Sequence, residues 1–274
     1  MIRGEEIIQG MNQSLDNQGQ DRITTALLLA AGTGSRLFPL TQFAPKCLTL
    51  VSEQSILDRL ITNLKNQGFT RLVIVTGHEQ ECIVDVLGKK SGSLEIEYIH
   101  SANYKTTNNI YSLWLARHRM TEPFVLFESD LVLNSALLDN MVYPNRIAVA
   151  KMQPWLQGTT VTIGTNNKVT QFHAGTQDSY SDTRYKTVNI YSFSIATWEQ
   201  ISLRLDAFIQ AGQDRCYYEN VFAEMVQHEI LTLEPVSFDH KNWFEIDTVA
   251  DLAEAELLFP ITVNKVSQPV MELA

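Results

Sequence analysis

The chain has 274 residues, of which 45% are hydrophobic and 19% charged, and its formal net charge is −10. This size and apolar content suit a globular enzyme with a substantial core. The negative charge argues against sequence-independent binding to nucleic acid, which relies on Lys and Arg side chains placed at phosphates. The sequence has no uncharged apolar run of the ~20 residues that span a bilayer, so we expect no membrane association.

The cysteines and the N-terminal residues bear on the cellular compartment. Cys47, Cys82 and Cys216 are odd in number and widely scattered, which favours neither a disulfide framework nor a zinc site. Reduced cysteines are usual in the cytoplasm. Residues 1–22 are polar and contain no apolar stretch of signal-peptide length. We therefore expect a cytoplasmic protein with a polar extension before a single domain over residues 23–274.

From residue 24 onward, short apolar runs alternate with helical patterns. The runs have the composition of strands buried on both faces of a sheet and cover residues 24–30, 71–77, 94–100 and 123–130. Between them, apolar residues at helical spacing predict helices over residues 55–68, 79–88 and 107–120. Alternation of this kind predicts an α/β fold, an open and mostly parallel doubly wound sheet with right-handed crossovers.

The pattern changes after residue 145 to shorter β-like pieces, over residues 146–151, 159–164, 168–172 and 186–195. The sequence Gly-Thr-Asn-Asn-Lys at 164–168 has the composition of a hairpin turn. We expect the β-rich part, about 151–196, to be an insertion that lies over the sheet. Helices are predicted again over 196–212 and 217–229, and a last helix begins near Asp247 or Thr248, either of which can cap it.

The stretch directly after the first predicted strand is the most informative. It contains the small residues Ala30, Ala31, Gly32 and Gly34. Ligands of doubly wound sheets bind at the carboxyl ends of the strands, and small residues there let backbone N–H groups approach a triphosphate. Arg36 and Lys46 add positive charge nearby. The stretch therefore predicts a phosphate-binding loop.

Two common nucleotide motifs do not account for this loop. A dinucleotide fingerprint needs a third glycine where this sequence has Leu37, and the G-x-x-x-x-G-K-[ST] phosphate loop does not occur. The string from Leu29 to Leu48 instead resembles the signature of the sugar-phosphate and phosphocholine nucleotidyltransferases, LAAGxGSRLxPLT followed by PKxL, and meets every fixed position. The resemblance implies a Rossmann-like nucleotidyltransferase fold, with Arg36 and Lys46 as catalytic residues that contact the triphosphate.

Two aspartates complete the resemblance. Asp130 ends the fourth predicted strand, and Asp247 lies in a segment similar to the family's E-I-D-t-x-x-D element. In the family these positions are catalytic metal ligands. Magnesium prefers hard carboxylate oxygens, so the resemblance implies a Mg²⁺ cofactor held by these two residues. On the residues alone, Asp247 can equally be a helix cap and Asp130 a turn residue.

Four further segments resemble the choline-phosphate and phosphonate (2-aminoethylphosphonate-type) cytidylyltransferase branch. They cover residues 103–117, 185–194, 217–222 and 243–247, and the whole resemblance runs from about 24 to 259. It implies CTP as the nucleotide and a small phosphorylated alcohol or phosphonate as the acceptor. The nucleotide-binding set expected from it is Leu29, Ala30, Ala31, Gly32, Gly34, Ser35, Arg36, Lys46, Gly77, Asn108, Ser112 and Ser129.

The acceptor is expected to contact a second set, made up of Tyr104, Trp155, Lys186, Asn189, Tyr218, Glu219, Trp243 and Glu245. Aromatic faces attract an ammonium group, though aromatic residues more often serve packing. Lys186 either binds the acceptor's phosphoryl group or is an ordinary surface lysine. Glu219 either pairs with an amine or is a solvated helix residue. The β-rich insertion would cover this acceptor site.

We therefore expect a magnesium-dependent cytidylyltransferase that transfers CMP from CTP to a small phosphonate or phosphorylated alcohol and releases pyrophosphate. One alternative is a sugar-1-phosphate nucleotidyltransferase that uses UTP, dTTP or GTP. Another is a sensor that binds nucleotide without turnover. The joint presence of Lys46, Asp130 and Asp247 argues against the sensor, because its chemistry does not need all three.

Overall fold

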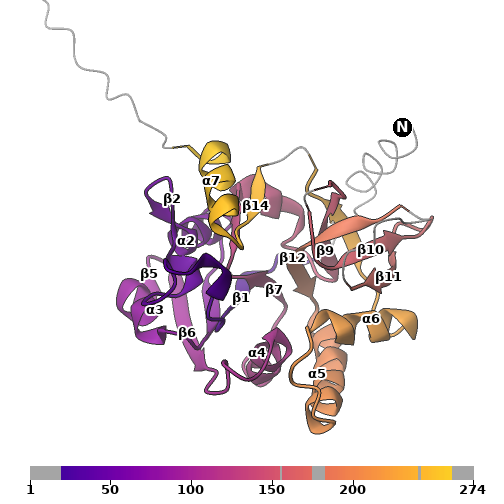
Figure 1. Cartoon of the computed structure of the whole chain (residues 1–274). Helices are drawn as coiled ribbons and strands as arrows, with labels where there is room; N and C mark the ends of the chain where they lie inside the picture. The colour runs from indigo at the N-terminus through magenta and orange to yellow at the C-terminus, as the bar shows by residue number, and fades with distance from the viewer. Residues whose placement is uncertain (1–19, 155, 175–182, 240–241, 261–274) are drawn as a thin grey trace, which may run out of the picture.

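A mixed sheet forms the centre of the protein. The computed structural model describes residues 20–154, 156–174, 183–239 and 242–260. Ten of the described strands join in one sheet, in the order β11-β10-β12-β7-β1-β4-β6-β5, with β9 beside β12 and β13 beside β9 (Figure 1). Their bounds are β1 Thr25–Ala30, β4 Arg71–Thr76, β5 Lys90–Ser91, β6 Leu94–His100, β7 Phe124–Glu128, β9 Arg146–Lys151, β10 Thr160–Ile163, β11 Val169–His173, β12 Tyr185–Phe193 and β13 Glu234–Ser237.

The core of the sheet is parallel, as the sequence predicts. Strand β1 pairs in parallel with β4 on one side and β7 on the other, and β4 pairs in parallel with β6. Every residue of β1 is buried, which matches its unbroken apolar composition. Strands β4 and β6 continue the sheet on one side of β1, whereas β7 lies on its other side, so the order of the strands reverses between β1 and β7. A crevice therefore opens at the carboxyl ends of β1 and β7.

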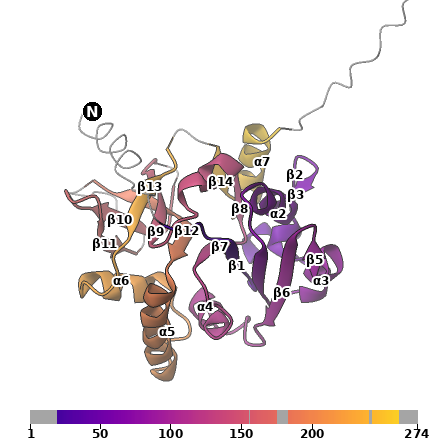
Figure 2. The ribbon, with the colours of Figure 1, turned by 180° about the vertical axis from the view of Figure 1, so that it is seen from behind.

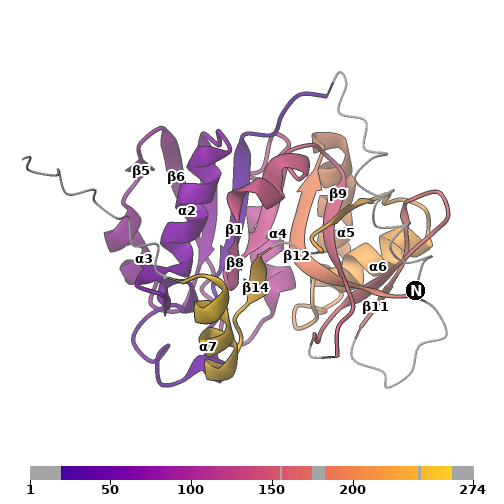
Figure 3. The same cartoon turned by 90° about the horizontal axis from the view of Figure 1, so that it is seen from above.

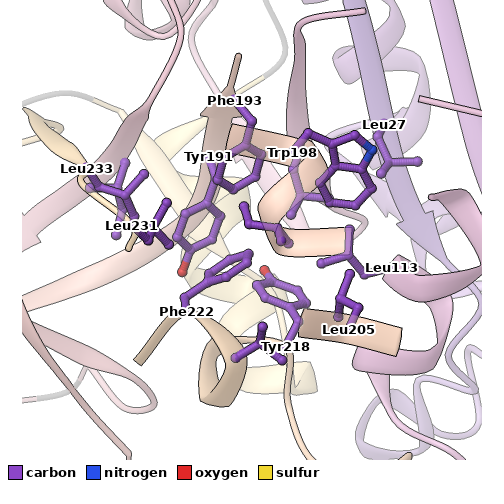
Figure 4. Packing of buried hydrophobic residues seen from close by; sticks show 14 of the residues in the cluster. Leu27, Leu113, Tyr191, Phe193, Trp198, Leu205, Tyr218, Phe222, Leu231 and Leu233 are labelled. Carbon is purple, nitrogen blue, oxygen red and sulfur yellow. The ribbon is translucent and has the colours of Figure 1, made fainter. Parts of the chain in front are cut away.

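Helices cover both faces of this sheet (Figures 1 and 2). Because side chains alternate along a strand, Leu27 and Leu29 of β1 pack in a cluster with α4, α5 and α6, whereas Ala26 and Leu28 pack in a second cluster with α2 and α3. Figure 4 shows the first cluster. The predicted doubly wound fold is thus confirmed. The helices are α2 Ile56–Asn66, α3 Gln80–Leu87, α4 Asn109–Ala116, α5 Ile195–Gln210, α6 Glu219–Gln227 and α7 Val249–Leu258.

The β-rich segment continues the sheet instead of forming a layer over it. Strand β12 pairs antiparallel with β7, β9 and β10, so the second half of the chain adds strands to the edge that β7 would otherwise leave open (Figure 3). Strands β10 and β11 form the predicted hairpin, in which Gly164 N–H donates to Lys168 O at 2.9 Å. Residues of the connection between β9 and β10, such as Gln153 and Gln157, reach the crevice together with Lys186 and Asn189 of β12.

Two short sheets lie outside the main one. Strands β2 (Leu50–Val51) and β3 (Gln54–Ser55) pair with each other, and β8 (Leu131–Leu133) pairs antiparallel with β14 (Trp243–Glu245). None of these short strands, nor β5 or β13, is predicted from the sequence. No helix among the described residues is both long and apolar enough to cross a membrane. The division into a polar extension and one domain stays a prediction, since residues 1–19 lie outside the described residues.

Candidate active site

A single large cavity of about 1710 Å³ lies at the carboxyl ends of β1 and β7. It brings together most of the side chains that the sequence proposes for a site. Those that line it are Leu29, Ala31, Gly32, Gly34, Ser35, Arg36, Lys46, Tyr104, Asn108, Ser112, Ser129, Asp130, Lys186, Asn189, Glu219, Trp243, Glu245 and Asp247. Residues that are far apart in the sequence therefore converge on one space.

The glycine loop forms one wall of the cavity. Gly34 has a left-handed φ of 61°, and a β-carbon placed there would lie 3.0 Å from Thr41 and 3.1 Å from Lys46, so only glycine suits both the backbone and the space. Thr41 Oγ1 donates to Gly34 O at 2.8 Å and fixes the bend. The loop thus lies directly against the side chains of Thr41 and Lys46.

Lys46 connects the two predicted metal-ligating aspartates. Its Nζ lies 2.9 Å from Oδ2 of Asp130 and 2.7 Å from Oδ1 of Asp247. Burial acts to lower the pKa of Lys46, but the two carboxylates outweigh burial and the net pKa is raised. The lysine is therefore held as an ammonium. Arg36, an exposed residue, also reaches Asp247, with Nη2 at 2.8 Å.

The strand pair β8–β14 brings Asp247 to Asp130, although the two are more than a hundred residues apart. In this pair Glu245 lies opposite Leu131, and Ile246 N–H donates to Asp130 O at 2.9 Å. Asp247 is not the cap of α7. Thr248 caps that helix in a reciprocal arrangement with Asp251, which leaves the Asp247 carboxylate for the site.

The aspartate pair fits a magnesium ion in its donor chemistry. Oδ1 of Asp130 is buried, and no hydrogen-bond donor among the described residues reaches it. Within the described part of the chain, no cluster of three His, Cys, Asp or Glu side chains is placed to hold a metal. Two carboxylates suit Mg²⁺, which keeps several waters and commonly completes its shell with phosphate oxygens. Asp130 and Asp247 would hold the ion here.

A second group of charges lies at the other end of the cavity, around Lys186. This side chain is 2% exposed, so it is not a surface lysine. Its Nζ donates to Thr187 O at 2.7 Å and lies 3.1 Å from Oε2 of Glu245. Asn189 Nδ2 donates to the other oxygen, Oε1, at 3.1 Å. Asn189 holds a left-handed φ of 59° where the β12–β9 register shifts, a costly conformation that often marks a functional position.

Two further acids adjoin this group. Desolvation raises the pKa of Glu128 well above its ordinary value, and the charges of Asp130 and Glu219 raise it further. Burial also raises the pKa of Glu219, to about 7, despite the nearby Lys186. Asn109 joins the elements that carry them. Its Nδ2 donates to Glu128 at 3.1 Å, and its Oδ1 accepts from Tyr218 N–H at the start of α6 at 3.0 Å.

Four predicted site residues are not placed on the cavity wall. Ala30 faces the opposite side of the sheet. A β-carbon at Gly77 would lie 2.5 Å from Ala31 O, so this glycine serves the close approach of two loops. The Tyr218 side chain is fully buried and packs against Tyr191 and Phe222 (Figure 4), which corrects its assignment to the acceptor wall. Trp155 lies outside the described residues.

The sequence interpretation left out two residues that organise the site. Glu128 stands two positions before Asp130, and the strand period of two turns both toward the same side. Asn109 is the second asparagine of the pair that begins α4, where Asn108 is the cap. The position of Glu128, two residues before Asp130, was a signal that the sequence already contained. The role of Asn109 depends on α6, which no local pattern reveals.

The chain is similar to known proteins over most of its length. The nucleotidyl transferase family profile matches residues 25–174. The CMP-5'-(3-aminopropyl)phosphonate synthase of Streptomyces rubellomurinus is 29% identical over 250 residues, which cover 85% of this chain and 38% of that protein. The choline-phosphate cytidylyltransferase of Streptococcus pneumoniae is 23% identical over 237 residues, which cover 84% of this chain and 96% of that one. The chain thus spans well under half of the first relative.

The solved structure of the CTP:phosphocholine cytidylyltransferase from Streptococcus pneumoniae is similar in fold. It aligns with a TM-score of 0.76 and 22% identity, over 87% of this chain and 100% of that one. At this identity the likeness concerns the fold. The predicted Rossmann-like nucleotidyltransferase fold is confirmed by it.

Proposed function

The chain belongs to the nucleotidyl transferase family, whose profile covers more than half of its length, and we propose that it transfers CMP from CTP to a small phosphonate or phosphorylated alcohol. Its relatives include cytidylyltransferases, which supports an active nucleotidyltransferase over a non-catalytic sensor. One observation supports the proposal most strongly. Lys46, Asp130 and Asp247 meet beside the glycine loop, at the place where a doubly wound sheet binds ligands.

The proposed reaction is a direct displacement at phosphorus. An oxygen of the acceptor's phosphoryl group attacks the α-phosphorus of CTP. The bond from that phosphorus to the α,β-bridging oxygen breaks, and pyrophosphate leaves with the electron pair. A magnesium ion on Asp130 and Asp247 would neutralise phosphate charge. Lys46 and Arg36 stabilise the charge that builds as pyrophosphate departs, and the glycine loop holds the triphosphate with its backbone N–H groups.

The opposite end of the cavity suits the acceptor. A second anion beside a triphosphate needs a cation of its own, and the remaining basic side chains on the described wall are Lys151 and Lys186. Lys151 is exposed at the end of β9. We assign the acceptor's phosphoryl group to Lys186, because its burial strengthens any charge-assisted hydrogen bond that it donates. Asn189 and Glu245 hold that lysine in place.

A pyrophosphate-release assay over four nucleoside triphosphates tests the proposal. We expect turnover with CTP and with 2-aminoethylphosphonate, phosphoethanolamine or phosphocholine as the acceptor, and little with the other nucleotides. Turnover with UTP, dTTP or GTP and glucose 1-phosphate, but not with CTP, would contradict it and favour a sugar-1-phosphate enzyme. The Asp130→Asn variant is the control for contaminating activity.

A further inference from the structure

The acceptor end of the cavity holds more carboxyl groups than basic groups. Glu128, Glu219 and Glu245 line it, and Lys186 is the basic side chain among them. Both oxygens of Glu245 are already used, one by Lys186 and the other by Asn189. Unpaired buried carboxylates are costly, so a site with this balance is completed by a cation that arrives from outside.

Glu219 marks the position at which we expect that cation to bind. The residue is 7% exposed, yet it lines the large cavity and also a second cavity of about 300 Å³ beside β11 and α6. Its Oε2 is buried, and no donor in the described part of the chain forms a hydrogen bond with it. A buried acceptor without a donor is rare in folded proteins, because each one loses its hydration without compensation. This oxygen is thus placed to accept an N–H group from a ligand.

We propose that Glu219 binds the primary ammonium group of the acceptor, and that the unsatisfied oxygen makes the site select primary amines over quaternary ones. The inference rests on the proposed function and names the substrate class more closely. A primary ammonium carries three N–H donors and can satisfy the carboxylate directly. A trimethylammonium group carries the same charge but has no N–H donor, and its methyl groups would keep Oε2 unsatisfied.

The aromatic residues next to Glu219 in the chain also favour a primary ammonium over a quaternary one. Quaternary ammonium ligands are held in cages of aromatic faces. Tyr218, the aromatic residue next to Glu219, points into the core and offers no face to the cavity. Tyr217 lines the cavity but is 58% exposed. Neither of the two tyrosines that precede Glu219 therefore forms an enclosed aromatic cage around its carboxylate.

The test compares ligands that differ only in the amine. Phosphoethanolamine, phosphocholine and ethyl phosphate would be titrated by calorimetry into the protein, with a CTP analogue that has a methylene group in place of the α,β-bridging oxygen. We expect phosphoethanolamine to bind at least tenfold more tightly than either of the others, the effect of one charge-assisted hydrogen bond to a buried group. In Glu219→Gln this advantage should fall to about threefold or less, while ethyl phosphate binds as before.

Glu199→Gln, an exposed position on α5, is the matched control and should bind all three ligands like the wild-type protein. Far-ultraviolet circular dichroism and CTP-analogue affinity verify that Glu219→Gln is folded. Equal or tighter binding of phosphocholine by the wild-type protein would overturn the inference. So would an undiminished preference for phosphoethanolamine in folded Glu219→Gln. Pyrophosphate release from CTP is measured separately, so failure of the proposed reaction is distinguished from failure of this assignment.

Discussion

The two ends of the cavity treat charge in opposite ways. At the nucleotide end, Lys46 lies between Asp130 and Asp247 and pairs with one oxygen of each, which leaves Oδ1 of Asp130 for a metal ion. At the acceptor end, Glu219 keeps a buried oxygen without a partner and Lys186 cannot balance all of the acids around it. At the nucleotide end, binding of CTP and a metal ion would replace existing ion pairs with new ones. At the acceptor end, a bound cation would supply a partner that is missing.

This contrast separates activity from stability. Removing a charge from the nucleotide end should damage catalysis, because those groups act on the developing charge of the transition state. Removing the unsatisfied acid from the acceptor end should instead relieve a cost of folding, because sites that are poised for a ligand are often strained without it. The predictions below test this contrast.

The largest expected effect on activity is at the two aspartates proposed to bind magnesium. Asp130→Asn and Asp247→Asn should each lower kcat by at least about 10²-fold, the size seen when one electrostatic stabiliser of a transition state is deleted. Pyrophosphate release at modest magnesium concentration measures the effect. Asp85→Asn, an exposed change on α3, is the control. Activity within about threefold of wild type for either site variant would remove that residue from the proposed machinery.

Lys46→Ala should lower kcat more than it raises KM for CTP. The lysine's charge matters most as pyrophosphate departs, so its loss affects the transition state more than the bound substrate. Steady-state kinetics with CTP as the varied substrate measures the two constants. A change in KM alone would mean that Lys46 only helps to dock the nucleotide.

Lys186→Met should destabilise the fold by up to about 3 kcal/mol, because it leaves the partly buried Glu245 without its lysine. The double change Lys186→Met with Glu245→Gln should recover much of this loss. Urea unfolding measures both. We also expect affinity for the CTP analogue to stay nearly unchanged in the double variant while KM for the acceptor rises. Normal acceptor kinetics in that variant would contradict the assignment of the phosphoryl group to Lys186.

Glu219→Gln should stabilise the protein at neutral and higher pH. The pKa of Glu219 is raised from 4.5 to about 7, so folding favours its protonated form, and stability falls as pH rises from 4.5 through about 7. The acid then costs on the order of 3 kcal/mol. Charged and titratable groups on the neighbouring elements are Lys186, Glu128, Glu245, Tyr191 and Tyr218.

Thermal unfolding at several pH values tests this sign. The melting temperature of Glu219→Gln should exceed that of the wild-type protein most at pH 8 and approach it near pH 4.5. Glu199→Gln should track the wild-type protein at every pH. A Glu219→Gln variant that is less stable than wild type at pH 8 would mean that this carboxylate has a stabilising partner.

The nucleotide end was within reach of sequence interpretation because its parts are local. The predicted strand at β1, the glycine loop and Lys46 follow one another within about twenty-five residues, and the carboxyl edge of the sheet places Asp130 beside them. Even so, the strand pair that delivers Asp247 was not predicted. Strands β8 and β14 have three residues each, too few to show a period.

The acceptor end was harder to predict because burial decides its chemistry. Lys186 and Glu219 occur in segments with ordinary polar surroundings, and sequence alone allowed each to be a solvated surface residue. Their burial follows from the way β12 and α6 pack against the extended sheet. Tyr218 shows the converse, since a polar aromatic next to a site residue turned out to belong to the core.

Because β14 pairs with β8, the active site can be completed only late in the synthesis of the chain. Chains leave the ribosome from the N-terminus, at about 5–20 residues per second, and domains fold in that order. The sheet from β1 to β12 precedes residue 194, whereas Asp247 and its strand come near the end. A nascent chain therefore carries its complete glycine loop for some seconds before it has both aspartates. The catalytic centre is therefore completed only when the last part of the chain has been synthesised.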